Sequence, residues 1–251
     1  MHRLLVESAR LAEESPELAV DLRRHLKVLR PEADERIELF DGCGRARAYI
    51  WRDGRLVADA GSPIRTARRP RPLALFACVT KGSRWDWTIE KATELGVTRI
   101  VPVISERTIV RLARAERAAK RERWRRIAED AARQSGALYL PEIEEAVDFA
   151  EALALVRETR CFVGALTEPP APFIAEALRA CDGEGEIAAF IGPEGDFTPH
   201  ELEELGRVAT KVSLGEAVLR AETAAIFAIS AIIAARGLVE TEGLEPPTLT
   251  V

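Results

Sequence analysis

The hydrophobic pattern of this chain changes its period across residues 61–72, and that change limits the possible folds more than any other feature. The segment contains three prolines and four arginines without periodicity, which is typical of a linker. Before it, residues 36–40, 45–51 and 55–60 alternate apolar and polar side chains and are separated by Asp-Gly turns. Together with one helix expected over residues 16–29, this pattern predicts a small β-barrel or sandwich.

After the linker, continuous apolar runs of strand length alternate with helical segments. We expect strands over residues 73–80, 97–105, 161–166 and 187–191, and helices over residues 83–96, 113–134, 172–180 and 199–208. Ser83 with Asp86 three residues later predicts a capping box at the first of these helices. Buried strands with helices between them predict an α/β fold with a mostly parallel sheet. The expected division is residues 1–68, residues 69–240 and a tail at residues 241–251.

The 251 residues include 36 Lys and Arg and 41 Asp and Glu, but these charges are unevenly distributed. Residues 65–133 hold 18 basic and 8 acidic residues, whereas residues 142–204 hold 3 basic and 16 acidic residues. A basic block in an acidic chain favours contact with a polyanion such as nucleic acid. For residues 116–126, a solvated helix with ion pairs between neighbouring turns is an equal alternative.

Cysteine usage and hydropathy indicate the compartment. The four cysteines form no Cys-x-x-Cys pair and have no histidine cluster nearby, so neither a disulfide framework nor a zinc site is expected. The longest apolar run, residues 224–235, is shorter than the ~20 residues of a membrane span. The N-terminus lacks the pattern of a signal peptide. We therefore expect a cytoplasmic protein with no metal and no membrane contact.

The first segment with chemical information follows the apolar run at residues 187–191, which leads directly into Gly192-Pro193-Glu194-Gly195. Thr198, Pro199 and Glu201 then predict a capped helix start. Glycines at the carboxyl end of a buried strand allow a ligand to approach the backbone, at the edge where α/β sheets bind ligands. A tight strand–helix connection would account for these glycines equally well.

The second segment, residues 212–225, ends a short strand at Leu214-Gly215 and places Arg220 and Glu222 before an almost wholly apolar helix. Charges beside a buried element are costly unless they are paired or used. The two side chains therefore form either a structural ion pair or part of a functional site. The helix, expected over residues 223–235, is apolar on all sides, which predicts burial against the core and a partner subunit in a homodimer.

Together the segments GPEGDFTPHEL and VSLGEAVLRAETAA resemble the C-terminal half of the SPOUT methyltransferases. The segments VTKGSRWDWTIEKATELGV, ISERTIVR and RQSGALYLPEI are similar to the ribosomal RNA small subunit methyltransferase E family. RRHLKVLRPEADERIELFDGCGRARAYI resembles the PUA-like barrel of that family. Ala137 stands where the family commonly has arginine, and Asp86 where it more often has glutamate.

The resemblance implies a fold and an activity. It implies a small PUA-like β-barrel RNA-binding domain at residues 1–68, followed by a SPOUT methyltransferase domain at residues 69–240 with a C-terminal trefoil knot. It also implies an enzyme that uses S-adenosylmethionine to methylate N3 of a uridine in small-subunit (16S) ribosomal RNA. The expected partner is that RNA or the assembled small ribosomal subunit.

The site residues also follow from the resemblance, which implies that loops of the knot bind the cofactor chiefly through backbone atoms. The matching positions are Leu166, Ile191, Gly192, Pro193, Glu194, Gly195, Leu214, Gly215, Val218, Leu219, Arg220 and Thr223. Uridine N3 carries a proton at neutral pH, so the reaction must remove it and stabilise an anionic ring. We expect Arg220 to stabilise that charge. Glu222, the second expected catalytic residue, would orient Arg220 or relay the proton.

Basic residues outside the knot complete the expected site. Positions rich in basic residues in the family match Arg3, Arg23, Arg24, Lys81 and Arg84, and we expect them to contact RNA phosphates. Two other interpretations remain open: a ribosome-assembly factor that has the fold but no transfer activity, and a methyltransferase that acts on another RNA. The glycines and Arg220 argue against the first, and the N-terminal resemblance argues against the second.

Overall fold

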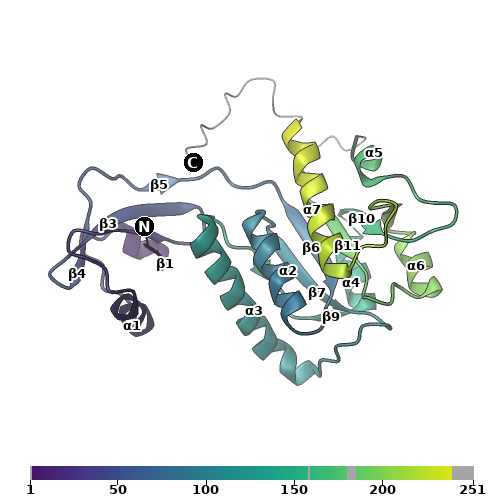
Figure 1. Cartoon of the computed structure of the whole chain (residues 1–251), viewed down its shortest axis with the longest axis horizontal. Helices are drawn as coiled ribbons and strands as arrows, with labels where there is room; N and C mark the ends of the chain where they lie inside the picture. The colour runs from purple at the N-terminus through teal and green to yellow at the C-terminus, as the bar shows by residue number, and fades with distance from the viewer. Residues whose placement is uncertain (1, 158, 180–184, 239–251) are drawn as a thin grey trace.

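A computed structural model of the chain describes residues 2–157, 159–179 and 185–238. The expected tail at residues 241–251 lies outside the described residues. Two sheets lie side by side, one formed by the N-terminal residues and a larger one flanked by helices (Figure 1). None of the helices in the described part of the chain is both long and apolar enough to span a membrane.

The N-terminal sheet contains β1 (His2–Leu5), β2 (Arg36–Phe40), β3 (Arg45–Arg52), β4 (Arg55–Ala58) and β5 (Arg65–Thr66). β1 is parallel to β2, and the other pairs are antiparallel. A 3-10 helix η1 (Ser8–Ala12) and α1 (Val20–Leu29) connect β1 to β2, so α1 is shorter than the helix expected over residues 16–29. β5 pairs with β3 within the segment that the sequence predicted to be a linker.

The larger sheet contains β6 (Leu73–Cys78), β7 (Arg99–Ile104), β8 (Glu142–Ile143), β9 (Val147–Asp148), β10 (Arg160–Gly164), β11 (Ile187–Ile191) and β12 (Ala209–Val212). The strand order is β12-β10-β11-β6-β7-β8, and β9 also pairs with β7. All of these pairs are parallel. The predicted α/β fold with a mostly parallel sheet is therefore confirmed.

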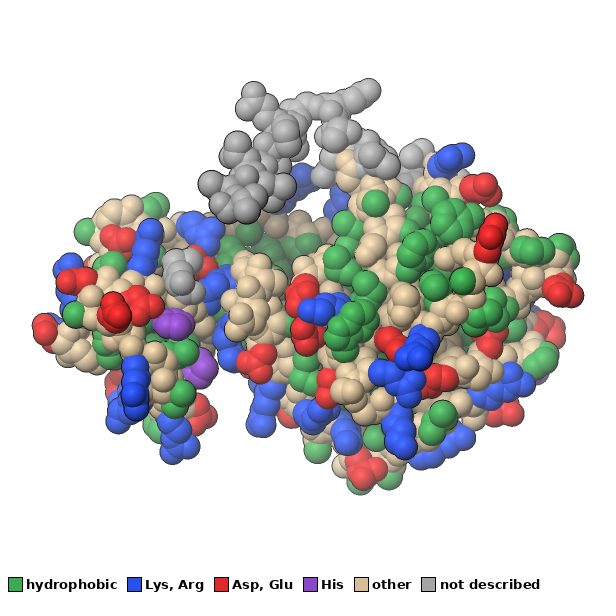
Figure 2. Space-filling model, in the orientation of Figure 1, with side chains coloured by type: hydrophobic (Ala, Val, Ile, Leu, Met, Phe, Trp, Pro, Cys, Tyr) green, Lys and Arg blue, Asp and Glu red, His purple; other side chains and the backbone are tan. Residues whose placement is uncertain are grey.

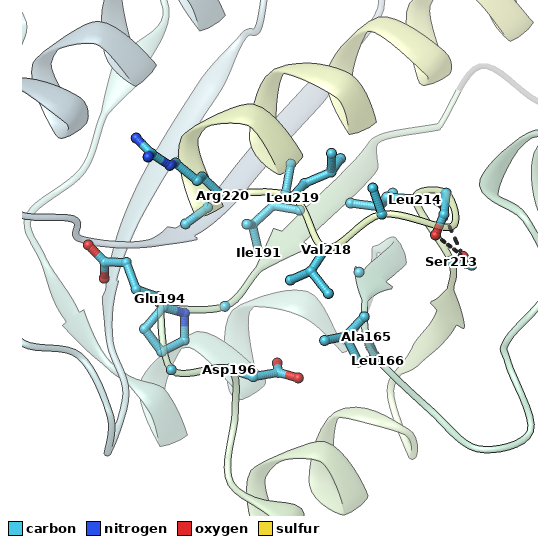
Figure 3. A pocket seen from close by; sticks show the side chains of 18 of the residues that line it. Ala165, Leu166, Ile191, Glu194, Asp196, Ser213, Leu214, Val218, Leu219 and Arg220 are labelled. Carbon is cyan, nitrogen blue, oxygen red and sulfur yellow. Dashed lines mark hydrogen bonds between the residues drawn. The ribbon is translucent and has the colours of Figure 1, made fainter.

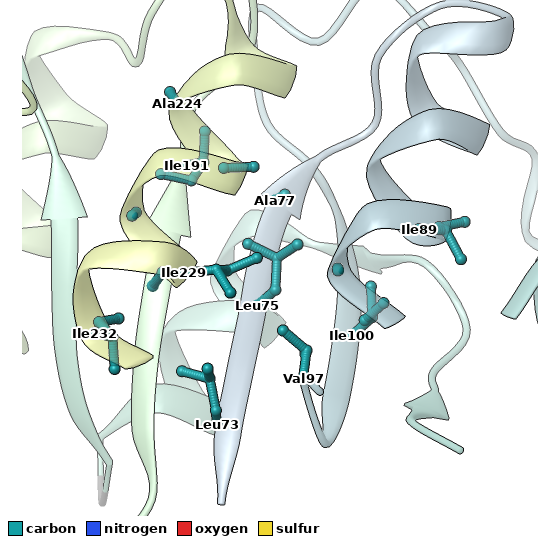
Figure 4. Close-up of a cluster of buried hydrophobic side chains, with 14 of the residues drawn as sticks. Leu73, Leu75, Ala77, Ile89, Val97, Ile100, Ile191, Ala224, Ile229 and Ile232 are labelled. Atoms are coloured by element: carbon teal, nitrogen blue, oxygen red, sulfur yellow. The ribbon is translucent and has the colours of Figure 1, made fainter. Parts of the chain in front are cut away.

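Helices cover both faces of this sheet because successive residues of its strands point to opposite sides. In β6, Leu73, Leu75 and Ala77 pack into one cluster, and the residues between them pack into another. The first cluster is covered by α2 (Ser83–Glu94), α3 (Arg114–Ser135), α5 (Ile174–Arg179) and α7 (Ala221–Leu238) (Figure 4). The second is covered by α4 (Phe149–Val156) and α6 (Pro199–Leu205). The strands are therefore buried on both sides, as their continuous apolar runs predicted.

One local prediction was wrong, and three elements were not predicted. Ser83 does not cap α2: the N-cap is Gly82, whose φ of 67° and ψ of −137° only a glycine adopts readily, and it makes no side-chain cap bond. The sequence also gave no expectation for β8, β9 and α4. For α4 a signal was present, because Asp148 is followed by Glu151, and the Glu151 carboxylate accepts a hydrogen bond from the Asp148 backbone N–H at 2.8 Å.

The sequence predicted that α7 is buried against the core and a partner subunit, and the single chain shows the part that faces the core. Ala225, Ala228, Ile229 and Ile232 are buried against the sheet. On the other side of the helix, Phe227 and Ile233 remain more than one-third exposed. The helix therefore presents an apolar face to the solvent in this chain.

Candidate functional site

A pocket of about 830 Å³ lies at the carboxyl ends of β10, β11 and β12, and we call it the strand-end pocket (Figure 3). Its walls are three loops, one after each of these strands, with Arg84 of α2 at the edge. The lining residues are Arg84, Gly164, Ala165, Leu166, Ile191, Gly192, Pro193, Glu194, Gly195, Asp196, Ser213, Leu214, Gly215, Ala217, Val218, Leu219, Arg220, Ala221 and Ala224. All the cofactor positions expected from the sequence lie here except Thr223.

The loop after β11 is a tight turn above the core. The Asp196 backbone N–H donates to the Pro193 carbonyl at 3.0 Å, and Asp196 has a φ of 57°. The Phe197 ring beneath the loop packs against Phe190. A Cβ at Gly192 would lie 3.0 Å from this ring. A side chain at position 192 would therefore crowd the ring beneath the loop, which supports the structural explanation for this glycine.

The start of α6 fixes the other end of that loop, as predicted. Thr198 is the N-cap, and its hydroxyl accepts a hydrogen bond from the Glu201 backbone N–H at 3.2 Å. One oxygen of Glu201 accepts from the Thr198 N–H at 2.9 Å. Its other oxygen accepts from the Glu106 N–H, also at 2.9 Å. Glu201 thus joins the loop to the segment that follows β7.

Arg107 makes a second connection between these two segments, and sequence reasoning did not identify it. Its Nη1 donates to the carbonyls of Gly195 at 3.0 Å and Phe197 at 3.3 Å. The segment ISERTIVR, which carried part of the family resemblance, contains both Glu106 and Arg107. Their partners are about 90 residues away in the chain, so only the tertiary structure reveals this connection.

The loop after β12 supplies the apolar side of the pocket. Gly215 has a φ of 132°, and its N–H donates to the Ser213 hydroxyl at 3.3 Å. Val218 is 75% exposed, and Leu166, from the loop after β10, is 61% exposed. Figure 3 shows these two side chains in the same part of the pocket. Large apolar side chains exposed within a concave site are typical of a ligand-binding surface.

The two expected catalytic residues do not form the ion pair that the sequence left open. Arg220 is exposed, and its side chain makes no hydrogen bond or ion pair with any described residue. A partner for its charge was expected because we assumed burial, and its exposure removes that requirement. In Figure 3 the side chains of Arg220 and Glu194 extend to the same edge of the pocket, where Glu194 pairs with Arg84 at 3.4 Å.

Glu222 lies outside the strand-end pocket. With Ser83, Arg84, Trp87 and Thr223 it lines an adjoining pocket of about 410 Å³, which we call the side pocket. Arg84 lines both pockets. The Oε2 atom of Glu222 is buried and has no hydrogen-bond partner among the described residues. An unpartnered buried acceptor beside an exposed tryptophan makes the side pocket a candidate for part of the substrate site.

The five expected RNA-binding residues separate into two groups. Arg23, Arg24 and Lys81 are exposed, and Arg84 is half-buried at the edge of both pockets. The expectation for Arg3 was wrong. Its side chain is 8% exposed, lies over the Phe40 ring, and donates to Glu38 at 2.7 Å and to the carbonyl of Ala132 at 2.6 Å. Arg3 therefore joins the N-terminal sheet to α3 and is not available to RNA.

The basic helix α3 has ion pairs between neighbouring turns at Arg125, which lies 3.6 Å from Glu122 and 3.4 Å from Glu129. Other arginines of the helix contact other elements. Arg117 donates to the carbonyl of Ala146 at 2.8 Å and to Asp148 at 2.6 Å. Arg121 donates to the carbonyl of Ile143 at 2.7 Å, and Arg123 pairs with Asp86. Much of the positive charge of this helix is therefore neutralised within the protein.

Within the described residues, no group of three or more His, Cys, Asp or Glu side chains could hold a metal ion.

Comparison with known proteins is consistent with this geometry. A family model for an RNA methyltransferase domain matches residues 67–233. Ribosomal RNA small subunit methyltransferase E from Rickettsia conorii is 30% identical over 239 residues, which cover 92% of this chain and 94% of that protein. The Synechocystis protein of the same name is 29% identical over 92% of this chain and 77% of its own length.

A solved structure extends the similarity to three dimensions. The crystal structure of ribosomal RNA small subunit methyltransferase E from Neisseria gonorrhoeae, bound to S-adenosylmethionine, superimposes with a TM-score of 0.79. The two chains are 31% identical, and the match covers 93% of this chain and 97% of the other. The chain belongs to the ribosomal RNA small subunit methyltransferase E family.

Proposed function

We propose that this protein uses S-adenosylmethionine to methylate N3 of a specific uridine in small-subunit (16S) ribosomal RNA. The observation that carries the proposal is the strand-end pocket, where three loops separated in sequence bring together the expected cofactor positions, Thr223 excepted. Membership of the ribosomal RNA small subunit methyltransferase E family supports the same activity and the same substrate class.

The residues of the strand-end pocket fit such a cofactor. A volume of about 830 Å³ lies within the range of small-molecule sites. The exposed apolar side chains of Leu166 and Val218 offer a surface for the flat adenine ring. Glu194 and Asp196 also line the pocket, and their carboxylates would favour the positively charged groups of this cofactor. When bound, the cofactor supplies a methyl group on a sulfonium, and the loops hold that group in a fixed orientation.

Residues of the chain must then remove the N3 proton and stabilise the negative charge of the uracil ring. The Arg220 side chain has no partner among the described residues and lines the pocket, so it is free to stabilise an anion on the substrate. Glu222 does not orient Arg220 in this structure. Its unpartnered oxygen favours the other expected role, acceptance of the N3 proton.

The remaining expectations complete the proposal. We propose a PUA-like RNA-binding domain at residues 1–68, a SPOUT domain at residues 69–240 with a trefoil knot around the strand-end pocket, and a cytoplasmic location. We also propose that four basic residues contact RNA phosphates because of their position and charge: Arg23, Arg24, Lys81 and Arg84.

A homodimer through α7 is supported by exposed Phe227 and Ile233. Phe227→Asp should give a folded monomer by light scattering if this interface is correct.

Cofactor binding is tested by placing a charge on the apolar wall. Val218→Asp puts a carboxylate where Leu166 and Val218 now present an apolar surface, and the exposed position should keep the fold intact. Val28→Asp is a matched control, since Val28 is also 75% exposed but lies on α1. Calorimetry should show weaker S-adenosylmethionine binding for Val218→Asp alone. Equal affinity in both variants would contradict the assignment of this pocket.

The substrate is tested in cells by mass mapping of methylated uridines in 16S ribosomal RNA with and without the gene. Loss of one N3-methyluridine supports the proposal. An unchanged map would contradict it.

A further inference from the structure

The N-terminal part of the chain contains a pocket that the proposed activity does not use. It has a volume of about 530 Å³ and lies between α1, residues 15–18 and the β3–β4 hairpin. In Figure 1 this region is at the opposite side of the molecule from β10 and β11, whose ends form the strand-end pocket. We call it the N-terminal pocket.

The floor of the N-terminal pocket is apolar and firmly held. Leu18, Leu26 and Leu56 are buried in the core of the N-terminal sheet, and half-buried Trp51 packs against the same cluster. The Ser15 hydroxyl donates to the carbonyl of Leu56 at 2.8 Å and fastens the segment that forms one wall. The Trp51 ring is therefore part of a preformed surface, accessible from one side.

The rim of the pocket is basic. Arg23 and Lys27 are four residues apart, which places them on one side of α1. Arg30, the C-cap residue of this helix, also lines the pocket. Arg55 faces them from the start of β4. All four are exposed, and Figure 2 shows blue side chains in the region where Figure 1 places α1. A cationic rim thus surrounds the apolar floor.

Little of this charge is neutralised by the protein. Glu17 is the one acidic residue among those lining the pocket in the described part of the chain, and it lies 3.6 Å from Arg23. Lys27, Arg30 and Arg55 make no side-chain hydrogen bond or ion pair with a described residue. Lys27 and Arg30 also lie near the C-terminus of α1, where a cation is favourable. That effect does not account for Arg55 or for the apolar floor.

We propose that the N-terminal pocket binds one unpaired nucleotide of RNA, with its base against Trp51 and the neighbouring phosphates on Lys27, Arg30 and Arg55. An aromatic surface bordered by cations is the combination that recognises single-stranded nucleic acid, because the base stacks while the backbone is neutralised. Paired bases are stacked within a duplex and cannot reach such a floor. The inference rests on the proposed RNA substrate, but not on methyl transfer.

The test is fluorescence anisotropy with the full chain and a labelled ten-nucleotide oligouridine over a range of salt concentrations. Trp51→Ala should weaken binding about tenfold, and Trp51→Phe should restore most of the affinity because it keeps a ring. Lys27→Ala, Arg30→Ala and Arg55→Ala should each reduce the slope of log affinity against log salt by about 0.7. Arg157→Ala is the control, since Arg157 is exposed and unpaired among the described residues but lies at the end of α4.

The outcomes separate this inference from the proposed function. Wild-type affinity and slope in both Trp51→Ala and Arg55→Ala overturn it. If Trp51→Ala does not fold, the exposed Lys27, Arg30 and Arg55 variants decide in the same way. Competition by polyglutamate as strong as by the oligouridine indicates an acidic protein partner and overturns it too. If the wild-type protein does not bind the oligouridine but does methylate small subunits, the nucleotide pocket is refuted. The proposed enzymatic function is then unaffected.

Discussion

Replacing Glu201 with alanine should loosen the loop that forms one wall of the strand-end pocket. Glu201 is 5% exposed, and its two oxygens accept hydrogen bonds from the backbone N–H groups of Thr198 and Glu106, each at 2.9 Å. Alanine leaves both donors without an acceptor, and each buried unpaired group costs about 1–3 kcal/mol. We therefore expect the free energy of unfolding to fall by roughly 2–6 kcal/mol. A loss of about 3 kcal/mol would lower Tm by roughly 6–12 °C.

The assay is urea unfolding of wild type, Glu201→Ala, Glu201→Gln and Glu203→Ala, followed by circular dichroism. Glu203 is the matched control on the same helix, because its side chain is 68% exposed and pairs only with Arg207 at the surface. Its loss should cost less than about 1 kcal/mol. Glutamine keeps one acceptor oxygen and should lose about half as much as alanine. If Glu201→Ala is as stable as Glu203→Ala, these buried hydrogen bonds do not hold the loop.

Three further predictions concern the site and its support. Arg220→Ala should reduce the rate of single-turnover methylation about 10²–10³-fold with an unchanged Tm. Arg220→Lys should recover little of that rate. A near-normal rate in Arg220→Ala would remove Arg220 from the catalytic residues. Gly192→Val should destabilise the fold by about 1–3 kcal/mol, because its Cβ meets the Phe197 ring at 3.0 Å; a variant of wild-type stability in thermal melts would contradict this. The Arg117 hydrogen bond lowers the pKa of Asp148 below 3.8, so the stabilisation is present above about pH 4 and disappears as pH falls through the lowered pKa. Asp148→Asn should lose this pH dependence in urea unfolding, and an unchanged profile would contradict it.

At Gly192 the sequence predicted the local structure but not the direction in which a side chain would point. The pattern of strand, two glycines and capped helix correctly predicted a loop at the end of a buried strand and the cap at Thr198. It left open whether Gly192 serves ligand approach or the tight connection. In the structure, a side chain at position 192 would point toward Phe197. The direction of a Cβ depends on tertiary packing, which the pattern of residues does not contain.

Long-range partners account for the other differences. From the sequence, Arg3 was expected to contact RNA phosphates. In the structure, the pairing of β1 with β2 brings its side chain to Glu38, and α3 supplies the carbonyl of Ala132 as a second acceptor. In the same way, the exposure of Arg220 and of one side of α7 follows from how α7 lies on the sheet. Local apolar periodicity predicted the strands and most helices. It could not predict charge pairing across more than 30 residues, because such pairs depend on the tertiary structure.

The proposed activity is tested most directly by reconstitution with purified components. The protein is incubated with S-adenosylmethionine and small ribosomal subunits lacking the modification, and the nucleosides of the digested 16S ribosomal RNA are identified by mass spectrometry. We predict N3-methyluridine in amounts that approach one per subunit for wild type, and a strong reduction for Val218→Asp. Absence of any methylated nucleoside, or methylation of another base, would contradict the proposed function.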